Sequence, residues 1–79
     1  MNIAQNLTII HNSKMSVERS NNQITFRGLG REFMFTFGNA GRVTVAEFCQ
    51  KEKVAKSFTK KLSCLDDLEF FVNSYVAGN

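Results

Sequence analysis

Proline and tryptophan are absent from this chain of 79 residues, and cysteine and histidine are scarce. Cys49 and Cys64 lie fifteen residues apart, and His11 is the single histidine. Three such side chains are too few for a zinc finger, and no Cys-x-x-Cys motif is present, so a zinc finger and a redox pair are both excluded. One disulfide is possible, but without a signal peptide we expect two free, buried thiols in a reducing cytosol.

Long apolar runs are also missing. No segment approaches the roughly 20 consecutive apolar residues that span a bilayer. The first twelve residues lack the basic start of a signal peptide, and Gln5, Asn6 and Thr8 interrupt them. We therefore expect a cytoplasmic protein that does not contact a membrane. The length allows one domain, residues 1–79, with a thin core, because a chain of this size buries only about 60% of its unfolded surface.

Residues that commonly carry catalysis do not occur in a recognisable combination. Gly28-Leu29-Gly30 lacks the third glycine and the following helix of a phosphate-binding loop. Asp66 and Asp67 are adjacent, so they point to different sides of a helix and cannot share a proton across a substrate. His11 has no triad partner nearby, and no Gly-x-Ser-x-Gly elbow occurs. The sequence predicts no enzyme activity, no cofactor and no metal site.

Six of the eight phenylalanines lie in the middle of the chain, where apolar and polar residues alternate. We interpret residues 15–61 as an antiparallel meander of four to five strands with a C-terminal helix packed on one face, which is an α+β fold. Asn21-Asn22 suits a two-residue type I′ turn, which sets Val17 opposite Phe26. The predicted sheet therefore has one apolar face and one polar face.

The remaining turns continue the apolar face. A three-residue loop with Gly41 in the left-handed conformation is needed before the fourth strand, because a two-residue loop would oppose Phe37 to Arg42. The predicted cross-strand pairs are Phe26–Phe33, Ile24–Phe35, Phe37–Val43, Phe35–Val45 and Val45–Phe58, together with Glu47–Lys56 and Cys49–Val54.

The period changes to 3.6 after the sheet, which predicts a helix at 64–77. Ser63 is a suitable N-cap residue, and acidic residues at 66, 67 and 69 suit the positive end of the helix dipole. The N-terminal segment, residues 1–14, fits either a short helix or a strand. The apolar stripe of the C-terminal helix comprises Leu65, Leu68, Phe71, Val72, Tyr75 and Val76.

Charge is unevenly distributed along the chain. Residues 1–62 hold ten bases and four acids, a net charge of +6, whereas residues 63–79 hold three acids and no base. Two explanations are open: lysines that protect an exposed sheet edge from pairing, or contact with an anionic partner, either nucleic acid or an acidic protein surface. The candidate partner-binding residues are Arg27, Arg42, Phe48, Lys51, Lys53, Lys56, Lys60 and Lys61.

The sheet face away from the helix carries an apolar island. Either the N-terminal segment covers this island or the island marks a contact site. The same register puts Lys56 and Lys60 on the phenylalanine face and Lys61 on the other, so these lysines cannot all line one groove. The apolar island comprises Met34, Ala46, Phe48 and Ala55.

A meander of strands closed by one C-terminal helix, in fewer than 80 residues, resembles the small phage-encoded inhibitors of bacterial defence, particularly anti-CRISPR proteins. The resemblance covers residues 15–77 in layout, without a shared sequence motif. It implies a non-enzymatic inhibitor in the host bacterial cytoplasm, monomeric or homodimeric. Such an inhibitor blocks a host protein or ribonucleoprotein complex by protein–protein contact.

Lys60-Lys61-Leu62-Ser63 resembles the strand–helix junction in the single-strand-binding fold of the eukaryotic transcriptional positive cofactor and its bacterial and phage relatives. That resemblance implies binding of single-stranded nucleic acid along a basic sheet edge. Those proteins need aromatic residues on the open sheet face, and here Phe48 is the clear candidate for base stacking. Inhibition by protein contact is therefore our first hypothesis for the function, and direct binding of single-stranded nucleic acid is the alternative.

Overall fold

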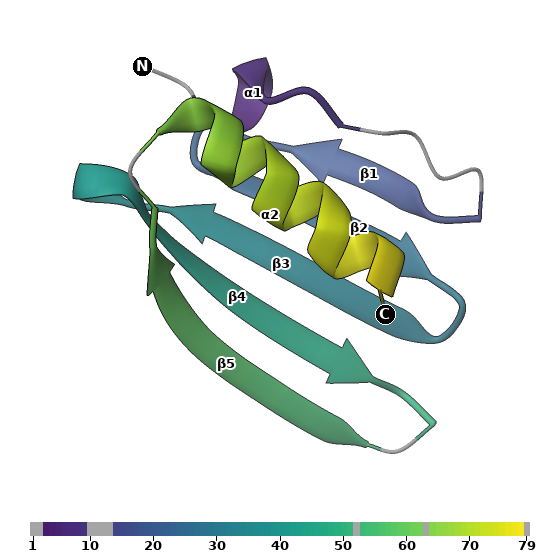
Figure 1. The fold of residues 1–79 in the computed structure, drawn as a ribbon. Coiled ribbons are helices and arrows are strands. Elements are labelled where there is room, and N and C mark those ends of the chain that lie inside the picture. The colour runs from purple at the N-terminus through teal and green to yellow at the C-terminus, as the bar shows by residue number, and fades with distance from the viewer. Residues whose placement is uncertain (1–2, 10–13, 52, 63, 79) are drawn as a thin grey trace.

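A computed structural model describes residues 3–9, 14–51, 53–62 and 64–78 of the chain. It contains a five-stranded antiparallel meander and a C-terminal helix, which confirms the predicted α+β fold (Figure 1). The strands follow one another across the sheet in chain order, so β1 and β5 are its edges. The elements are α1 (Ile3–Asn6), β1 (Ser16–Arg19), β2 (Gln23–Gly28), β3 (Arg31–Phe37), the 3₁₀ turn η1 (Asn39–Gly41), β4 (Arg42–Cys49), β5 (Val54–Lys61) and α2 (Leu65–Gly78).

The strand register agrees with the predicted register. Residues of β3 alternate between buried and half-buried, so a slip of one residue would turn Phe33, Phe35 and Phe37 away from the core. The observed pairs include Val17–Phe26, Phe26–Phe33, Ile24–Phe35, Phe35–Val45, Phe37–Val43, Val45–Phe58, Glu47–Lys56 and Cys49–Val54.

Turn conformation differs from the prediction between β1 and β2. Asn21 and Asn22 form a two-residue loop, but a type I′ turn needs a positive φ at both central residues. Among the described non-glycine residues, only Leu29 and Lys53 have a positive φ, so the type I′ assignment of Asn21-Asn22 is wrong. The carbonyl oxygen of Asn22 accepts a hydrogen bond from the N–H of Phe37 (2.8 Å), which ties this loop to β3. Two successive positive φ values, typical of type I′, occur instead at Leu29 (55°) and the glycine after it (73°).

We expect Leu29→Asn to stabilise the protein by about 0.5–1 kcal/mol. Leu29 is 71% exposed, so its side chain contributes little packing. Its left-handed backbone is unfavourable for leucine and better tolerated by asparagine. The measurement is the midpoint of urea unfolding, with Leu29→Ala as the control that shortens the side chain without easing the backbone. Equal midpoints for the two variants would show that Leu29 is not strained.

Helix α2 lies over one face of the sheet and closes the core (Figure 1). Leu68, Val72 and Val76 are buried, whereas Leu65 of the predicted stripe is exposed. The helix spans Leu65–Gly78, one residue later at each end than predicted, and its predicted N-cap at 63 lies outside the described residues. No helix in the described part of the chain combines the length and apolarity needed to cross a membrane.

The N-terminal segment lies beside α2, on the same side of the sheet (Figure 1). It begins with the short helix α1, one of the two conformations that the sequence allowed. The N–H of Thr8 donates to Glu69 Oε1 (2.9 Å), and Asn73 Nδ2 donates to the carbonyl oxygen of Thr8 (3.0 Å). Arg19 Nη1 donates to the carbonyl oxygen of Leu7 (2.8 Å). The described part of this segment therefore does not cover the apolar island on the opposite face, and residues 1–2 and 10–13 lie outside the described residues.

Candidate protein-interaction surface

Strand β5 is an exposed sheet edge. Every described side chain between residues 55 and 61 is exposed, and in the described part of the chain no strand pairs with its outer side. On an edge strand of an antiparallel sheet, every second residue directs its N–H and C=O groups outward. Such groups are a template for another strand. The opposite edge, β1, has only four residues, so β5 offers the longer template.

A groove separates α2 from β5. This aromatic groove has a volume of about 370 Å³. Phe58 of β5 adjoins it, with its ring centroid 5.8 Å from that of Tyr75. Phe70 is 75% exposed and Phe58 is 40% exposed, so the groove presents aromatic surface to solvent. Its lining residues are Lys60, Leu62, Asp67, Phe70, Phe71, Ser74 and Tyr75.

The sequence pattern did not indicate this groove. Alternation predicts Phe58 on the core face, and it does stand opposite Val45, yet it remains partly exposed. Phe70 lies outside the predicted helix stripe, since it precedes Phe71 and so points about 100° away around the helix. An apolar residue outside the stripe of a predicted helix is the signal that could have identified Phe70.

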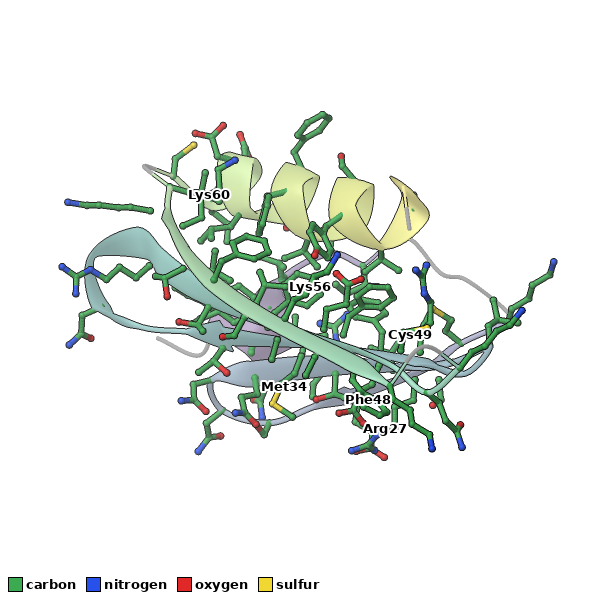
Figure 2. All side chains as sticks on the ribbon, turned by 90° about the horizontal axis from the view of Figure 1, so that it is seen from below. Arg27, Met34, Phe48, Cys49, Lys56 and Lys60 are labelled. Atoms are coloured by element: carbon green, nitrogen blue, oxygen red, sulfur yellow. The ribbon has the colours of Figure 1, made fainter. Side chains whose placement is uncertain are left out.

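The aromatic groove is bordered by charges of both signs. Lys60 Nζ lies 5.0 Å from the ring centroid of Phe71, a cation–π arrangement. Asp67 lines the groove from α2. Figure 2 shows Lys56 and Lys60 on the helix side of the sheet, where they flank Phe58 along β5. A partner segment that lies along β5 therefore faces two lysines with an aromatic ring between them.

Tyr75 lies beside the phenylalanine core and lines the groove. Its ring packs edge-on against Phe33 and Phe35, with centroids 5.8 and 6.0 Å apart. Its hydroxyl donates a hydrogen bond to the carboxylate of Glu47 on β4. Burial, followed by the hydrogen bond to Glu47 and the charge of Glu47, raises the pKa of Tyr75 to about 12. Glu47, which the register sets opposite Lys56, therefore orients the ring that lines the groove.

We expect Tyr75 to titrate near pH 12 in the folded protein, against about 10 for an exposed tyrosine. The chain contains one tyrosine and no tryptophan, so the ultraviolet absorbance of tyrosinate reports this group alone. Because the folded pKa exceeds the unfolded pKa, the associated stabilisation is complete below about pH 10 and is lost as pH rises toward 12. Glu47→Gln should lower the midpoint, and a wild-type midpoint near 10 would contradict the contact.

The predicted partner-binding residues fall on two sides of the sheet. Lys56 and Lys60 lie on the groove side of β5, whereas Lys61 lies on the other side, as the register predicts. Arg42 stands opposite Lys61, at the end of the sheet where β5 leads toward α2. The turn between β4 and β5, at the other end, holds the exposed side chains of Lys51 and Lys53.

The open face holds Phe48, which stands opposite Glu32, and Arg27, which stands opposite Glu32 on the other side. Figure 2 shows Arg27, Met34 and Phe48 on the side of the sheet away from α2. Arg27 Nε lies 2.6 Å from Glu32 Oε2, and its Nη1 lies 3.1 Å from Glu18 Oε2. The hydrogen bond to Glu32 and the two negative charges raise the pKa of Arg27. Arg27 already has two carboxylate partners and is therefore poorly placed to bind an acidic partner.

Both cysteines are free thiols, but the expectation that they are buried is wrong. Cys49 is half-buried and Cys64 is exposed. Cys49 stands opposite the first residue of β5, whereas Cys64 lies beyond the other end of that eight-residue strand, so a disulfide between them is not in reach. Among the residues that the structure describes, no cluster of three or more His, Cys, Asp or Glu could hold a metal ion. His11 lies outside those residues.

The fold and the surface define a small α+β domain with two exposed features, an unpaired edge strand and an aromatic groove. No protein-family model matches the sequence, and no curated protein or solved structure is significantly similar to it. The chemistry of the surface is therefore the basis on which a function is proposed.

Proposed function

We propose that this chain is a non-enzymatic binding protein that occupies a surface of a larger protein or ribonucleoprotein complex. The proposal is supported by one observation, an eight-residue unpaired edge strand with exposed aromatic rings beside it. Exposed apolar surface rimmed by charge marks interaction sites, and an unpaired edge offers main-chain hydrogen bonds. The more specific function, a phage-encoded inhibitor of a host defence complex, rests on the resemblance of layout.

Lysines on an edge strand also protect it from pairing with other chains. Lys56, Lys60 and Lys61 could serve that purpose in β5. Protection does not account for Phe58 or Phe70, because exposed aromatic rings next to a free edge favour association. A binding site explains the edge and the aromatic groove together.

Single-stranded nucleic acid is the second candidate partner. The observation in its favour is Lys60 beside the exposed rings of Phe58 and Phe70, because bases stack on aromatic rings near cations. Against it, a single strand carries a negative charge at every nucleotide and cannot avoid Asp67, which lines the groove, whereas a protein segment can place an uncharged residue there. The lysines of β5 also point to both faces of the sheet, so they do not form one channel. We therefore expect an acidic protein segment as the partner.

The test is capture of proteins from a nuclease-treated bacterial lysate by the immobilised domain. Lys56→Glu with Lys60→Glu reverses the two groove-side lysines. Lys61→Glu with Arg42→Glu makes the same charge change on the opposite side of the sheet. We expect the groove-side pair to reduce capture about tenfold or more and the control pair to reduce it less than about threefold. Moderate salt should weaken capture by the wild-type protein.

Two outcomes would contradict this function. Equal capture by all three proteins would show that the lysines only protect the edge. The nucleic-acid probe is a generic single strand of roughly 20 nucleotides, for which we expect no measurable binding at physiological salt. Submicromolar binding that is lost on Phe48→Ala or Phe70→Ala would favour nucleic acid instead. Its log affinity should then fall linearly with log salt, by about 0.7 per phosphate contact.

A further inference from the structure

We infer that β5 accepts an added strand from its partner, and that the preferred strand carries an apolar residue between two acidic residues at alternate positions. This inference rests on the proposed protein partner and extends it, because it states the conformation and the side-chain pattern of the bound segment. Three features support it: the free backbone of β5, the alternation of its side chains and the aromatic groove on one side.

The backbone of β5 is already held in an extended strand conformation before a partner binds. It pairs with β4 along its whole length, from Val54 opposite Cys49 to Lys61 opposite Arg42. A preorganised edge lowers the entropy cost of binding, and its main-chain hydrogen bonds supply affinity without selecting a sequence. Side chains of β5 must therefore provide the specificity.

Side chains of β5 alternate between two very different surfaces. The groove side presents Lys56, Phe58 and Lys60, whereas the opposite side presents Ser57 and Thr59 between them. Residues that stand opposite each other on neighbouring strands point to the same face. A partner strand in register thus places every second side chain against lysine, phenylalanine and lysine. The side chains of Ser57 and Thr59 are small and uncharged, so they do not select particular residues at the remaining positions of the partner strand.

The middle residue of the pattern meets the aromatic groove. A side chain opposite Phe58 packs on its ring, which adjoins the groove through the ring of Tyr75. The groove, with a volume of about 370 Å³, has room for one side chain of the size of leucine or phenylalanine. An apolar residue at this position removes the exposed part of Phe58 from water, so the middle position favours an apolar side chain.

The flanking residues of the pattern meet Lys56 and Lys60. Opposite charges on neighbouring strands stabilise pairing and like charges oppose it, which favours Asp or Glu two residues before and two residues after the apolar residue. The same argument disfavours a second copy of this chain as the partner. Antiparallel pairing of two β5 strands centred on Phe58 would set Lys56 of one copy against Lys60 of the other.

The probe is the peptide acetyl-Ser-Glu-Thr-Leu-Thr-Glu-Ser-amide. Its isomer, acetyl-Glu-Ser-Thr-Leu-Thr-Ser-Glu-amide, has the same composition and charge, but its acids lie on the opposite face of an extended strand from leucine. Neither peptide is aromatic, so the fluorescence of Tyr75, the one tyrosine of a chain without tryptophan, reports binding. We expect the first peptide to bind about tenfold or more tightly than its isomer.

Phe58 and Phe48 provide a matched pair of variants, because they are 40% and 43% exposed on opposite faces of neighbouring strands. Phe58→Ser should reduce peptide binding about tenfold or more, and Phe48→Ser should change it less than about twofold. The backbone is tested without altering the protein, by methylating alternate amide nitrogens of the peptide in two complementary sets. One set faces β5 and should abolish binding, and the other should spare it.

Equal binding of the two isomers, or equal effects of the two methylated sets, would overturn strand addition. If both isomers bind equally and Lys56→Glu with Lys60→Glu abolishes the binding of both, the proposed protein contact is retained, as an electrostatic contact without strand addition. Failure of both peptides to bind at millimolar concentration would also overturn strand addition, and lysate capture then decides the proposed function separately. Displacement of the peptide by a single-stranded oligonucleotide would overturn the inference in favour of nucleic acid.

Discussion

Replacing Phe35 with alanine should destabilise the protein by about 3–5 kcal/mol. Phe35 is fully buried near the centre of β3. Its ring packs edge-on against the rings of Phe26, Phe71 and Tyr75, with centroids 5.7, 6.3 and 6.0 Å away. Alanine would therefore leave a cavity where the sheet meets α2. A loss of this size approaches the whole stability of a small domain, about 5 kcal/mol, so a large fraction of the variant should be unfolded.

Chemical denaturation followed by circular dichroism measures this effect. Phe48→Ala is the control, because it removes the same side chain from the open face and should cost less than about 1 kcal/mol. If the two variants unfold at the same denaturant concentration, Phe35 is not at the centre of the core. The register of β2, β3 and β4 would then be wrong.

Gly41→Ala should destabilise the protein by more than about 2 kcal/mol. Gly41 ends the 3₁₀ turn between β3 and β4 with a φ of 75°, as the sequence predicts, in the left-handed region that disfavours residues with a Cβ. A Cβ at this position would overlap the carbonyl oxygen of Leu62, well inside the 3.0 Å that real Cβ atoms keep. The N–H of Leu62 also donates to the carbonyl oxygen of Gly41 (2.9 Å), so relief of the overlap would strain that bond.

The variant Gly30→Ala separates the cost of the left-handed backbone from the cost of the overlap with Leu62. Gly30 has nearly the same φ, 73°, but nothing lies within 4 Å of a Cβ built there. Gly30→Ala should therefore cost about 1 kcal/mol, from the backbone alone. The difference in unfolding free energy between the two variants measures the contact of Gly41 with Leu62. Equal losses would show that the chain relieves this overlap at no cost.

The contact between Gly41 and Leu62 also positions the aromatic groove. Leu62 joins β5 to α2 and lines the groove. Its attachment to the β3–β4 turn therefore sets where α2 begins relative to β5. We expect Gly41→Ala to weaken peptide binding at β5. Gly30→Ala, at the other end of β3, should leave that binding unchanged.

The strand register could be predicted because two independent patterns agree. Alternation assigns each residue to a face of the sheet, and turn length assigns each residue its partner. Phe35 satisfies both patterns as the neighbour of Ile24 and Val45. The conformation of the Asn21-Asn22 turn could not be predicted in this way. Its local preference for positive φ is weak, and the hydrogen bond between the N–H of Phe37 and the Asn22 carbonyl joins it to a distant strand.

Local periodicity in the sequence was sufficient to predict the α+β fold, the order of the elements and the side of β5 on which each lysine lies. The position of α2 over the sheet needed the packing of the whole molecule. The helix stripe specifies which side of α2 is buried, but a helix about 10 Å wide cannot cover five strands spaced about 4.8 Å apart. The N-terminal segment fills the β1 side, where Arg19 holds the carbonyl oxygen of Leu7. No element in the described part of the chain lies over the β5 side, so Phe58 stays partly exposed there.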